Sequence, residues 1–113
     1  MIVIYKICTT AEWRAAERVG VFRGSDVDRR DGYIHFSTVG QVAETAAKHF
    51  AGKTDLLLVS VDAARLGSRL KWEPSRGGSL FPHLYGDLDV TSVMKVEPLM
   101  LGPDGHHIFP LGH

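Results

Sequence analysis

The chain has a single cysteine, Cys8, among its 113 residues. An internal disulfide is therefore impossible, and a reducing compartment is the expected setting. An excess of charge is also missing, because thirteen basic and thirteen acidic residues give a formal net charge of zero. That balance disfavours broad electrostatic binding to nucleic acid or to an anionic membrane, although it leaves room for a local anion pocket. Cys8 lies in an apolar run and is expected to be an inert core residue.

Long apolar stretches and targeting features are missing too. No run approaches the roughly 18 apolar residues that a membrane helix needs. The first residues have neither the basic lead nor the long apolar stretch of a signal peptide. We therefore expect a cytoplasmic protein without a membrane span. The 44% of hydrophobic and 23% of charged residues are typical of a globular chain. A length of 113 residues predicts one domain over residues 1–113.

Several patterns that mark common active sites are absent. The chain contains no Gly-x-Ser-x-Gly, which disfavours serine hydrolase chemistry. It contains neither a P-loop nor the Gly-x-Gly-x-x-Gly of dinucleotide-binding folds. No His-x-x-x-His or Cys-x-x-Cys spacing occurs, so we expect no metal site. Any site must therefore be built from residues without a standard signature.

The first half of the chain alternates between strand and helix patterns. Ile2 to Ile7 is a short apolar run that predicts a strand. Thr9 to Glu12 matches a capping box, which starts a helix that Gly20 is placed to end. Residues 22–30 are polar and predict a loop. Gly32 to Ser37 predicts a second strand.

The second half adds one helix and several strands. A capping box at Thr38 to Gln41 opens a helix over Gln41 to Phe50. Leu56 to Val61 is uniformly apolar and predicts a central strand covered on both faces. Further strands are expected at Leu70 to Glu73 and at Val93 to Leu101, the latter folding back as a hairpin with residues 108–111. Together these elements predict a compact α+β domain with a mixed β-sheet and two main short helices.

The predicted second strand carries the first group of chemically active side chains. Alternation directs Tyr33, His35 and Ser37 to one face and leaves Ile34 and Phe36 for the core. A histidine beside hydroxyl groups can donate, accept or carry a proton near neutral pH. We therefore expect His35 to be a catalytic residue. The alternative is a structural histidine that is bonded to the backbone.

A second group follows the next strand and predicts an anion site. Glu73, Ser75 and Arg76 precede a pair of glycines, whose backbone N–H groups can approach a ligand closely. An arginine offers a forked contact to phosphate or carboxylate. Glu73 is the second catalytic candidate, with the role of orienting His35, His83 or Arg76. The alternative is a solvated turn in which Glu73 and Arg76 pair with each other.

Aromatic residues surround the second histidine. In an extended segment, Phe81, His83 and Tyr85 would point the same way. Aromatic faces suit stacking on a planar ring such as a nucleobase or nicotinamide. The alternative is a corner of the core, which is the expected role for Phe81. The polar groups of His83 and Tyr85 favour ligand-binding roles.

Taken together, these segments resemble a known family. The matching blocks are Ile4 to Ile7, Asp31 to Thr38 with Gln41, and Trp72 to Gly86. By this resemblance the chain is identified as a member of the bacterial domain-of-unknown-function family 952. That family is grouped with proteins that resemble ADP-ribosyltransferases. The resemblance implies a split α+β fold that grips NAD in a cleft, with NAD as the expected cofactor.

The resemblance also implies roles for individual residues. His35-Phe36-Ser37 is similar to the histidine, apolar residue and serine that end a strand in RNA 2′-phosphotransferases of the wider group. His35 and Ser37 would then contact a ribose or a phosphate. The last strand lacks the Gln-x-Glu or Glu-x-Glu of the transferases, and Glu97 is its only acid. The expected ligand-binding residues are Tyr5, Lys6, Tyr33, Ser37, Thr38, Ser75, Arg76, His83 and Tyr85.

Two classes of function follow from these observations. In the first, a polar cleft binds a nucleotide or similar anionic ligand such as NAD or ADP-ribose, with glycosyl or ADP-ribosyl transfer as the candidate activity. In the second, the His, Glu and Arg cluster is a buried network that fixes the sheet of a non-catalytic interaction module. The first class predicts that His35 and Arg76 are exposed in an open cleft, whereas the second predicts that both are buried. The sequence leaves the enzymatic activity and the oligomeric state undetermined.

Overall fold

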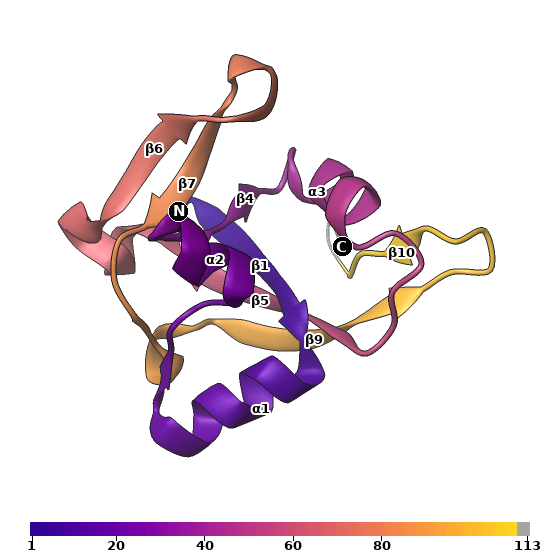
Figure 1. The fold of residues 1–113 in the computed structure, drawn as a ribbon, viewed down its shortest axis with the longest axis horizontal. Coiled ribbons are helices and arrows are strands. Elements are labelled where there is room, and N and C mark those ends of the chain that lie inside the picture. The colour runs from indigo at the N-terminus through magenta and orange to yellow at the C-terminus, as the bar shows by residue number, and fades with distance from the viewer. Residues whose placement is uncertain (111–113) are drawn as a thin grey trace.

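Five strands form the main sheet, in the order β10–β9–β5–β1–β4 (Figure 1). The computed structural model describes residues 1–110, apart from the side chain of Arg76. The strands of this sheet are β1 (Val3–Thr9), β4 (Ser37–Thr38), β5 (Leu56–Asp62), β9 (Lys95–Leu101) and β10 (His107–Ile108). The predicted C-terminal hairpin is confirmed as β9–β10, while the expected pairing at residue 111 lies outside the described residues.

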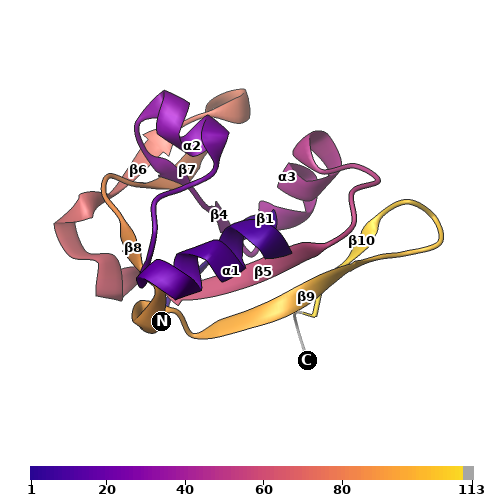
Figure 2. The same ribbon diagram turned by 60° about the horizontal axis from the view of Figure 1, so that its bottom comes forward.

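Strand β5 is the centre of the core and is covered on both faces, as its apolar run predicted. Leu57, Val59 and Val61 pack into one cluster with residues of α1 (Thr10–Val19). Leu56 and Leu58 pack into a second cluster with residues of α3 (Val42–His49). Figure 2 shows α1 lying along the main sheet beside β1 and β5. This packing fixes β1, the strand that carries Tyr5 and Lys6.

Both main helices lie where the sequence predicted them, but only the first has the predicted capping box. Both bonds of the capping box at Thr9 and Glu12 are present, and α1 ends at Gly20 in the left-handed conformation. The predicted helix from Gln41 to Phe50 is α3, one residue shorter at each end. The capping box predicted at Thr38 does not cap this helix, because its N-cap is Gln41 and no side chain caps it. The Gln41 side chain instead accepts the N–H of Thr38 at 3.0 Å in the preceding turn.

Two smaller sheets flank the main one. One has the order β3–β7–β6 and consists of β3 (Ile34–His35), β7 (Leu80–Leu84) and β6 (Leu70–Pro74). The other pairs β2 (Val21–Phe22) with β8 (Leu88–Asp89). Short 3-10 helices link these strands as η1 (Ala63–Arg69), η2 (Arg76–Gly78) and η3 (Val90–Ser92). The β6–β7 and β9–β10 hairpins project from different sides of the molecule (Figure 1).

The prediction of one continuous strand from Gly32 to Ser37 was wrong. The chain breaks at Phe36, whose N–H donates to the carbonyl oxygen of Pro82 at 3.0 Å. Before the break, β3 pairs with β7; after it, β4 pairs with β1. The expected core pair, Ile34 and Phe36, is buried as predicted. The crossing between sheets places His35 on one sheet and Ser37 on the other.

The prediction of a mixed sheet was also wrong. Every strand pairing within residues 1–110 is antiparallel. The connection from β1 to β5 is long enough for a parallel crossover, so its length could not reveal the direction of the pairing. The radius of gyration, 13.3 Å, is that of one compact α+β domain of this size. No helix in the described range is long and apolar enough to cross a membrane.

Residues 22–30 are not simply a loop, because they contain most of a third helix. Helix α2 (Asp26–Asp31) begins with a capping box between Ser25 and Asp28 and ends at Gly32. Gly24 precedes it at a φ of +99°, and a Cβ there would lie 2.6 Å from the Cβ of Asp28. In Figure 2, α2 sits beside the β6–β7 hairpin. This position brings Asp28 against the strands that carry the candidate site.

Candidate functional site

An open cavity of about 590 Å³ lies where α2 and α3 meet β1, β4 and β7. Its volume is within the range of small-molecule sites, about 300–1,000 Å³. The cavity brings together residues that the sequence predicted from four separate segments. Those in its lining are Tyr5, Lys6, His35, Ser37, Ser75 and His83.

The remaining predicted residues have different positions. Tyr33, Glu73 and Tyr85 are outside the lining, but each contacts a histidine of the cavity or its partner. Thr38 is outside the lining as well and continues the main sheet in β4. The predicted role of the Arg76 side chain lies outside the described residues.

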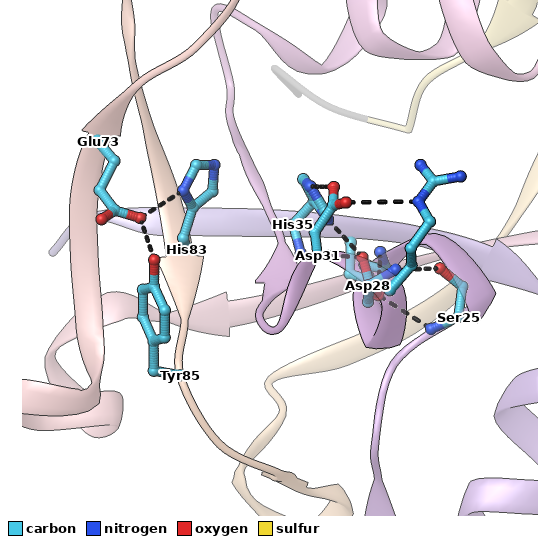
Figure 3. A network of polar contacts seen from close by, with 9 residues as sticks. Ser25, Asp28, Asp31, His35, Glu73, His83 and Tyr85 are labelled. Carbon is cyan, nitrogen blue, oxygen red and sulfur yellow. Dashed lines mark hydrogen bonds and ion pairs between the residues drawn. The ribbon is translucent and has the colours of Figure 1, made fainter.

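Asp28 is the centre of the polar network, and the sequence interpretation missed it. Its side chain is buried, with a relative exposure of 2% for the residue. Oδ1 lies 2.6 Å from Nδ1 of His35 and accepts the backbone N–H of the same residue at 3.1 Å. Oδ2 lies 2.7 Å from Nζ of Lys6 and accepts the N–H of Ser25 at 3.0 Å (Figure 3). The serine and aspartate three residues apart were the signal that could have predicted the cap.

The partners of Asp28 determine its charge. Burial pushes the pKa of this carboxyl upwards, but the hydrogen bond from His35 and the positive charge of Lys6 outweigh it. The net effect holds the pKa of Asp28 well below its usual range. Asp28 is therefore an anion throughout the physiological range, and it neutralises the buried ammonium of Lys6.

The free energy of unfolding is expected to fall as the pH is lowered below about 4, the pKa of an unfolded aspartate. A carboxyl with a lowered pKa in the folded state stabilises the fold above its unfolded pKa, and protonation removes that contribution. Thermal unfolding between pH 6 and pH 3 should therefore depend less on pH in Asp28→Asn than in the wild type. Asp26→Asn, on an exposed position of the same helix, should keep the wild-type dependence. Equal pH dependence in all three proteins would contradict this role of Asp28.

His35 lies between two carboxylates and borders the cavity. Its Nδ1 faces Asp28, and its Nε2 lies 3.0 Å from Oδ2 of Asp31 at the end of α2. The His35 side chain is 31% exposed. The acid that faces its Nδ1, Asp28, is buried, whereas the acid that faces its Nε2, Asp31, is partly exposed. The contact with Asp28 is a hydrogen bond, whereas the contact with Asp31 is a close approach at ion-pair distance.

His83 is the second histidine of the cavity and has a carboxylate of its own. Oε1 of Glu73 lies 2.8 Å from Nδ1 of His83 and accepts the hydroxyl of Tyr85, also at 2.8 Å. Hydrogen bonds from His83 and then from Tyr85 lower the pKa of Glu73. His83 is 3% exposed. The predicted role of Glu73 as an orienting acid fits His83 and does not fit His35.

Tyr33 connects the two histidines. Its ring stacks on that of His83 with centroids 4.1 Å apart, and it lies 4.6 Å from the ring of His35. The two imidazoles are 5.5 Å apart in an edge-to-face arrangement. Strand pairing explains this proximity, because His35 and His83 are direct partners in the register of β3 and β7. Figure 3 shows the two histidines side by side, each with its own acid.

Hydroxyls and charges of both signs complete the cavity. Ser37 exchanges a hydrogen bond of 2.9 Å with Thr45, which the sequence interpretation missed. The basic side chains of the lining are Lys6, Arg30 and Lys53, and its acids are Glu12, Asp26, Asp28 and Asp31. Lys6 is paired with Asp28, and Nε of Arg30 lies 3.5 Å from Oδ1 of Asp31, so Lys53 is the lining cation that has no carboxylate partner among residues 1–110.

Two further expectations concern cysteine and metals. Cys8 is buried, and burial raises the pKa of its thiol to about 12, which confirms the inert core role. Among residues 1–110, no group of three or more His, Cys, Asp or Glu side chains is placed to hold a metal ion.

Comparison with known proteins identifies the family. The family model described as "Protein of unknown function (DUF952)" matches residues 7–96. A crystal structure of protein CC0527 from Caulobacter crescentus is 51% identical over 94% of this chain and 93% of that one, with a TM-score of 0.91. A solution NMR structure of CC0527 is 52% identical over 92% and 90% of the two chains, with a TM-score of 0.84. No curated protein matches. The family membership that the sequence blocks predicted is thus confirmed, and the chain belongs to the family of proteins of unknown function DUF952.

Proposed function

We propose that the cavity binds a small nucleotide-type ligand, with NAD and ADP-ribose as the first candidates. One observation supports the proposal most strongly: His35, His83, Lys6 and Ser37 come from separate segments and line one cavity of ligand size. Ordinary packing gives no reason to gather two histidines, each with an ordered carboxylate, at one cavity.

The lining offers a contact for each part of such a ligand. Arg30 and Lys53 supply positive charge for phosphate groups. Ser37 and Ser75 supply hydroxyls for a ribose, and Phe36 and Phe81 supply apolar surface for a planar ring. Cavities of this kind combine apolar walls with a few polar groups that fix the orientation of the ligand.

ADP-ribosyl or glycosyl transfer is the enzymatic form of this proposal, on an ADP-ribosyltransferase-like fold. Its support is the resemblance of His35-Phe36-Ser37 to the wider group, together with the presence of His35 and Ser37 in one cavity. His35 is then the catalytic residue, and Glu73 acts through His83, which it contacts. Proton transfer by a positioned histidine is the chemistry that such a role requires.

A second candidate function is a non-catalytic interaction module. It is favoured by the burial of the network, since Lys6 is 6% and Asp28 only 2% exposed. A fully satisfied network of this kind fixes a unique arrangement of the core without any ligand. The open position of His35 favours the ligand-binding function instead, because a purely structural network would seal the histidine in.

Ligand binding is tested by thermal unfolding of the wild type and of His35→Ala with a panel of compounds. The panel contains NAD, ADP-ribose, nicotinamide, nucleoside phosphates and inorganic phosphate. A ligand present at about 100 times its Kd should stabilise the wild type by about 2.7 kcal/mol, a shift that is easily measured. We expect NAD or ADP-ribose to stabilise the wild type and to lose most of this effect in His35→Ala.

His106→Ala is the matched control, because His106 lies on the β9–β10 turn and outside the cavity lining. It should respond to each compound as the wild type does. Each variant is compared with its own ligand-free unfolding temperature, so that a change in intrinsic stability does not affect the comparison. An absence of stabilisation by every compound would reject the nucleotide proposal and favour the interaction module.

A further inference from the structure

Of the three histidines that line the cavity, His35, His49 and His83, the first and the last are arranged alike in one respect. In each, Nδ1 faces a carboxylate, Asp28 for His35 at 2.6 Å and Glu73 for His83 at 2.8 Å. An ionised carboxylate only accepts hydrogen bonds, so each Nδ1 carries a proton. This fixes the tautomer of both rings and directs the chemistry of each to its Nε2. Tyr33 lies against both rings and holds their mutual orientation.

The two Nε2 atoms differ, and the difference gives the histidines opposite roles. Nε2 of His35 lies 3.0 Å from Oδ2 of a second carboxylate, Asp31, so both nitrogens of this ring face acids. Nε2 of His83 has no hydrogen-bond partner within the described part of the chain. With its proton on Nδ1, this atom presents a lone pair. His35 is thus prepared to give a proton and His83 to take one.

We infer that His35 and His83 form a general acid and general base pair that acts on a phosphodiester, with nucleoside 2′,3′-cyclic phosphates as the substrate class. The inference deepens the proposed nucleotide site and rests on it. In-line displacement at phosphorus places the entering and leaving oxygens on opposite sides, and each needs its own proton-transfer group. Imidazoles 5.5 Å apart on one cavity can serve both oxygens of a single phosphoryl group.

In the hydrolytic step, one phosphorus–oxygen bond forms, another breaks, and two protons are transferred. Nε2 of His83 takes a proton from water as the water oxygen forms a bond to phosphorus. The phosphorus–oxygen bond to one ribose oxygen breaks, and that oxygen takes the proton from Nε2 of His35. The product is a nucleoside monophosphate, and proton exchange with solvent restores both rings. To reach Nε2 of His35, the departing oxygen displaces the carboxylate of Asp31, which is partly exposed at the end of α2.

The cavity supplies charge for the phosphoryl oxygens that do not react. Arg30 and Lys53 line it, and Nζ of Lys6 has further donors besides the one that faces Asp28. Positive groups near a developing phosphoryl anion lower the barrier to its formation. The apolar side chains of Phe36 and Phe81 leave room for the base of a nucleotide beside this polar end.

The experiment follows hydrolysis of adenosine 2′,3′-cyclic phosphate by phosphorus NMR and its binding by calorimetry. His35→Asn and His83→Asn keep a side-chain amide near the position of Nδ1 but cannot transfer protons. We expect each to lower kcat by about 10²–10⁴-fold with little change in Kd. His106→Asn, outside the cavity lining, should retain the wild-type kcat and Kd.

The outcomes separate this inference from the proposed function. Binding of the cyclic nucleotide without hydrolysis by the wild type would overturn the acid–base pair and leave the nucleotide site standing. Hydrolysis that is unchanged in His83→Asn would also overturn it. Failure to bind any nucleotide would reject both the acid–base pair and the nucleotide site. If the buried His83 variant does not fold, Glu73→Gln replaces it. Glu73 is a positioning residue, so this variant should lower kcat and leave KM unchanged.

Discussion

Replacement of Asp28 by alanine is expected to lower the free energy of unfolding by about 3–5 kcal/mol. The change leaves the ammonium of Lys6 buried without its counterion. It also removes the acceptor of the His35 ring and of the backbone N–H groups of His35 and Ser25. Domains of this kind are stable by only about 5–15 kcal/mol, so the loss is a large part of the total. Chemical denaturation at neutral pH, followed by circular dichroism, measures it.

Asp26→Ala is the matched control for this prediction. Asp26 lies two residues before Asp28 on the same helix, but its side chain is fully exposed and contacts only the exposed Arg29 in the described part of the chain. Exposed ion pairs contribute little to stability, so this variant should unfold close to the wild type. If Asp28→Ala were as stable as Asp26→Ala, the buried network would not hold α2 against the strands.

The parts of the fold that the sequence predicted well are those that local patterns determine. The apolar side chains of β5 point to both faces of the sheet and are buried only when both faces are covered, as they are in the structure. The capping box at Thr9 and Glu12 forms within a single turn, so it requires no information about distant residues. Both patterns act over a few residues, which is why a single sequence was sufficient.

Helix α2 was missed because its sequence has no apolar stripe. It has six residues, and all but Val27 are charged, so hydrophobic periodicity gives no signal. The box that starts it uses Asp28 in place of the usual glutamate or glutamine. The burial of Asp28 depends on Lys6 of β1 and His35 of β3, which are brought to it by the tertiary structure. A local pattern could not predict that burial.

The candidate site was predicted as separate residues but not as a pair of histidines. His35 and His83 were each identified from their neighbours in sequence. Their proximity follows from the register between β3 and β7, a long-range pairing that a single sequence does not determine. The β6–β7 hairpin places Glu73 beside His83, and this contact selects His83 from the three partners that the sequence left open for the acid.

A double-mutant cycle of Lys6→Met and Asp28→Asn is expected to show strong coupling. Each single change leaves one buried charge without its partner, which should destabilise the fold by about 3–5 kcal/mol. The double variant removes both charges, while the single amide oxygen of the asparagine can still accept one of the two N–H groups, that of His35 or that of Ser25. Its loss should therefore be smaller than the sum of the two single losses by about 1–3 kcal/mol. Denaturation curves of the four proteins provide the coupling energy.

The double variant also distinguishes the two classes of function, because it separates the charges of the network from its shape. If Lys6 and Asp28 serve only to fix the core, the folded double variant should bind the ligand of the cavity as the wild type does. If they serve the site, it should fold but bind weakly, because position 6 no longer offers an ammonium to the ligand and position 28 no longer offers a carboxylate to His35. We expect the second result, measured by calorimetry with the compound that stabilises the wild type. Undiminished binding would assign the network to the structure alone.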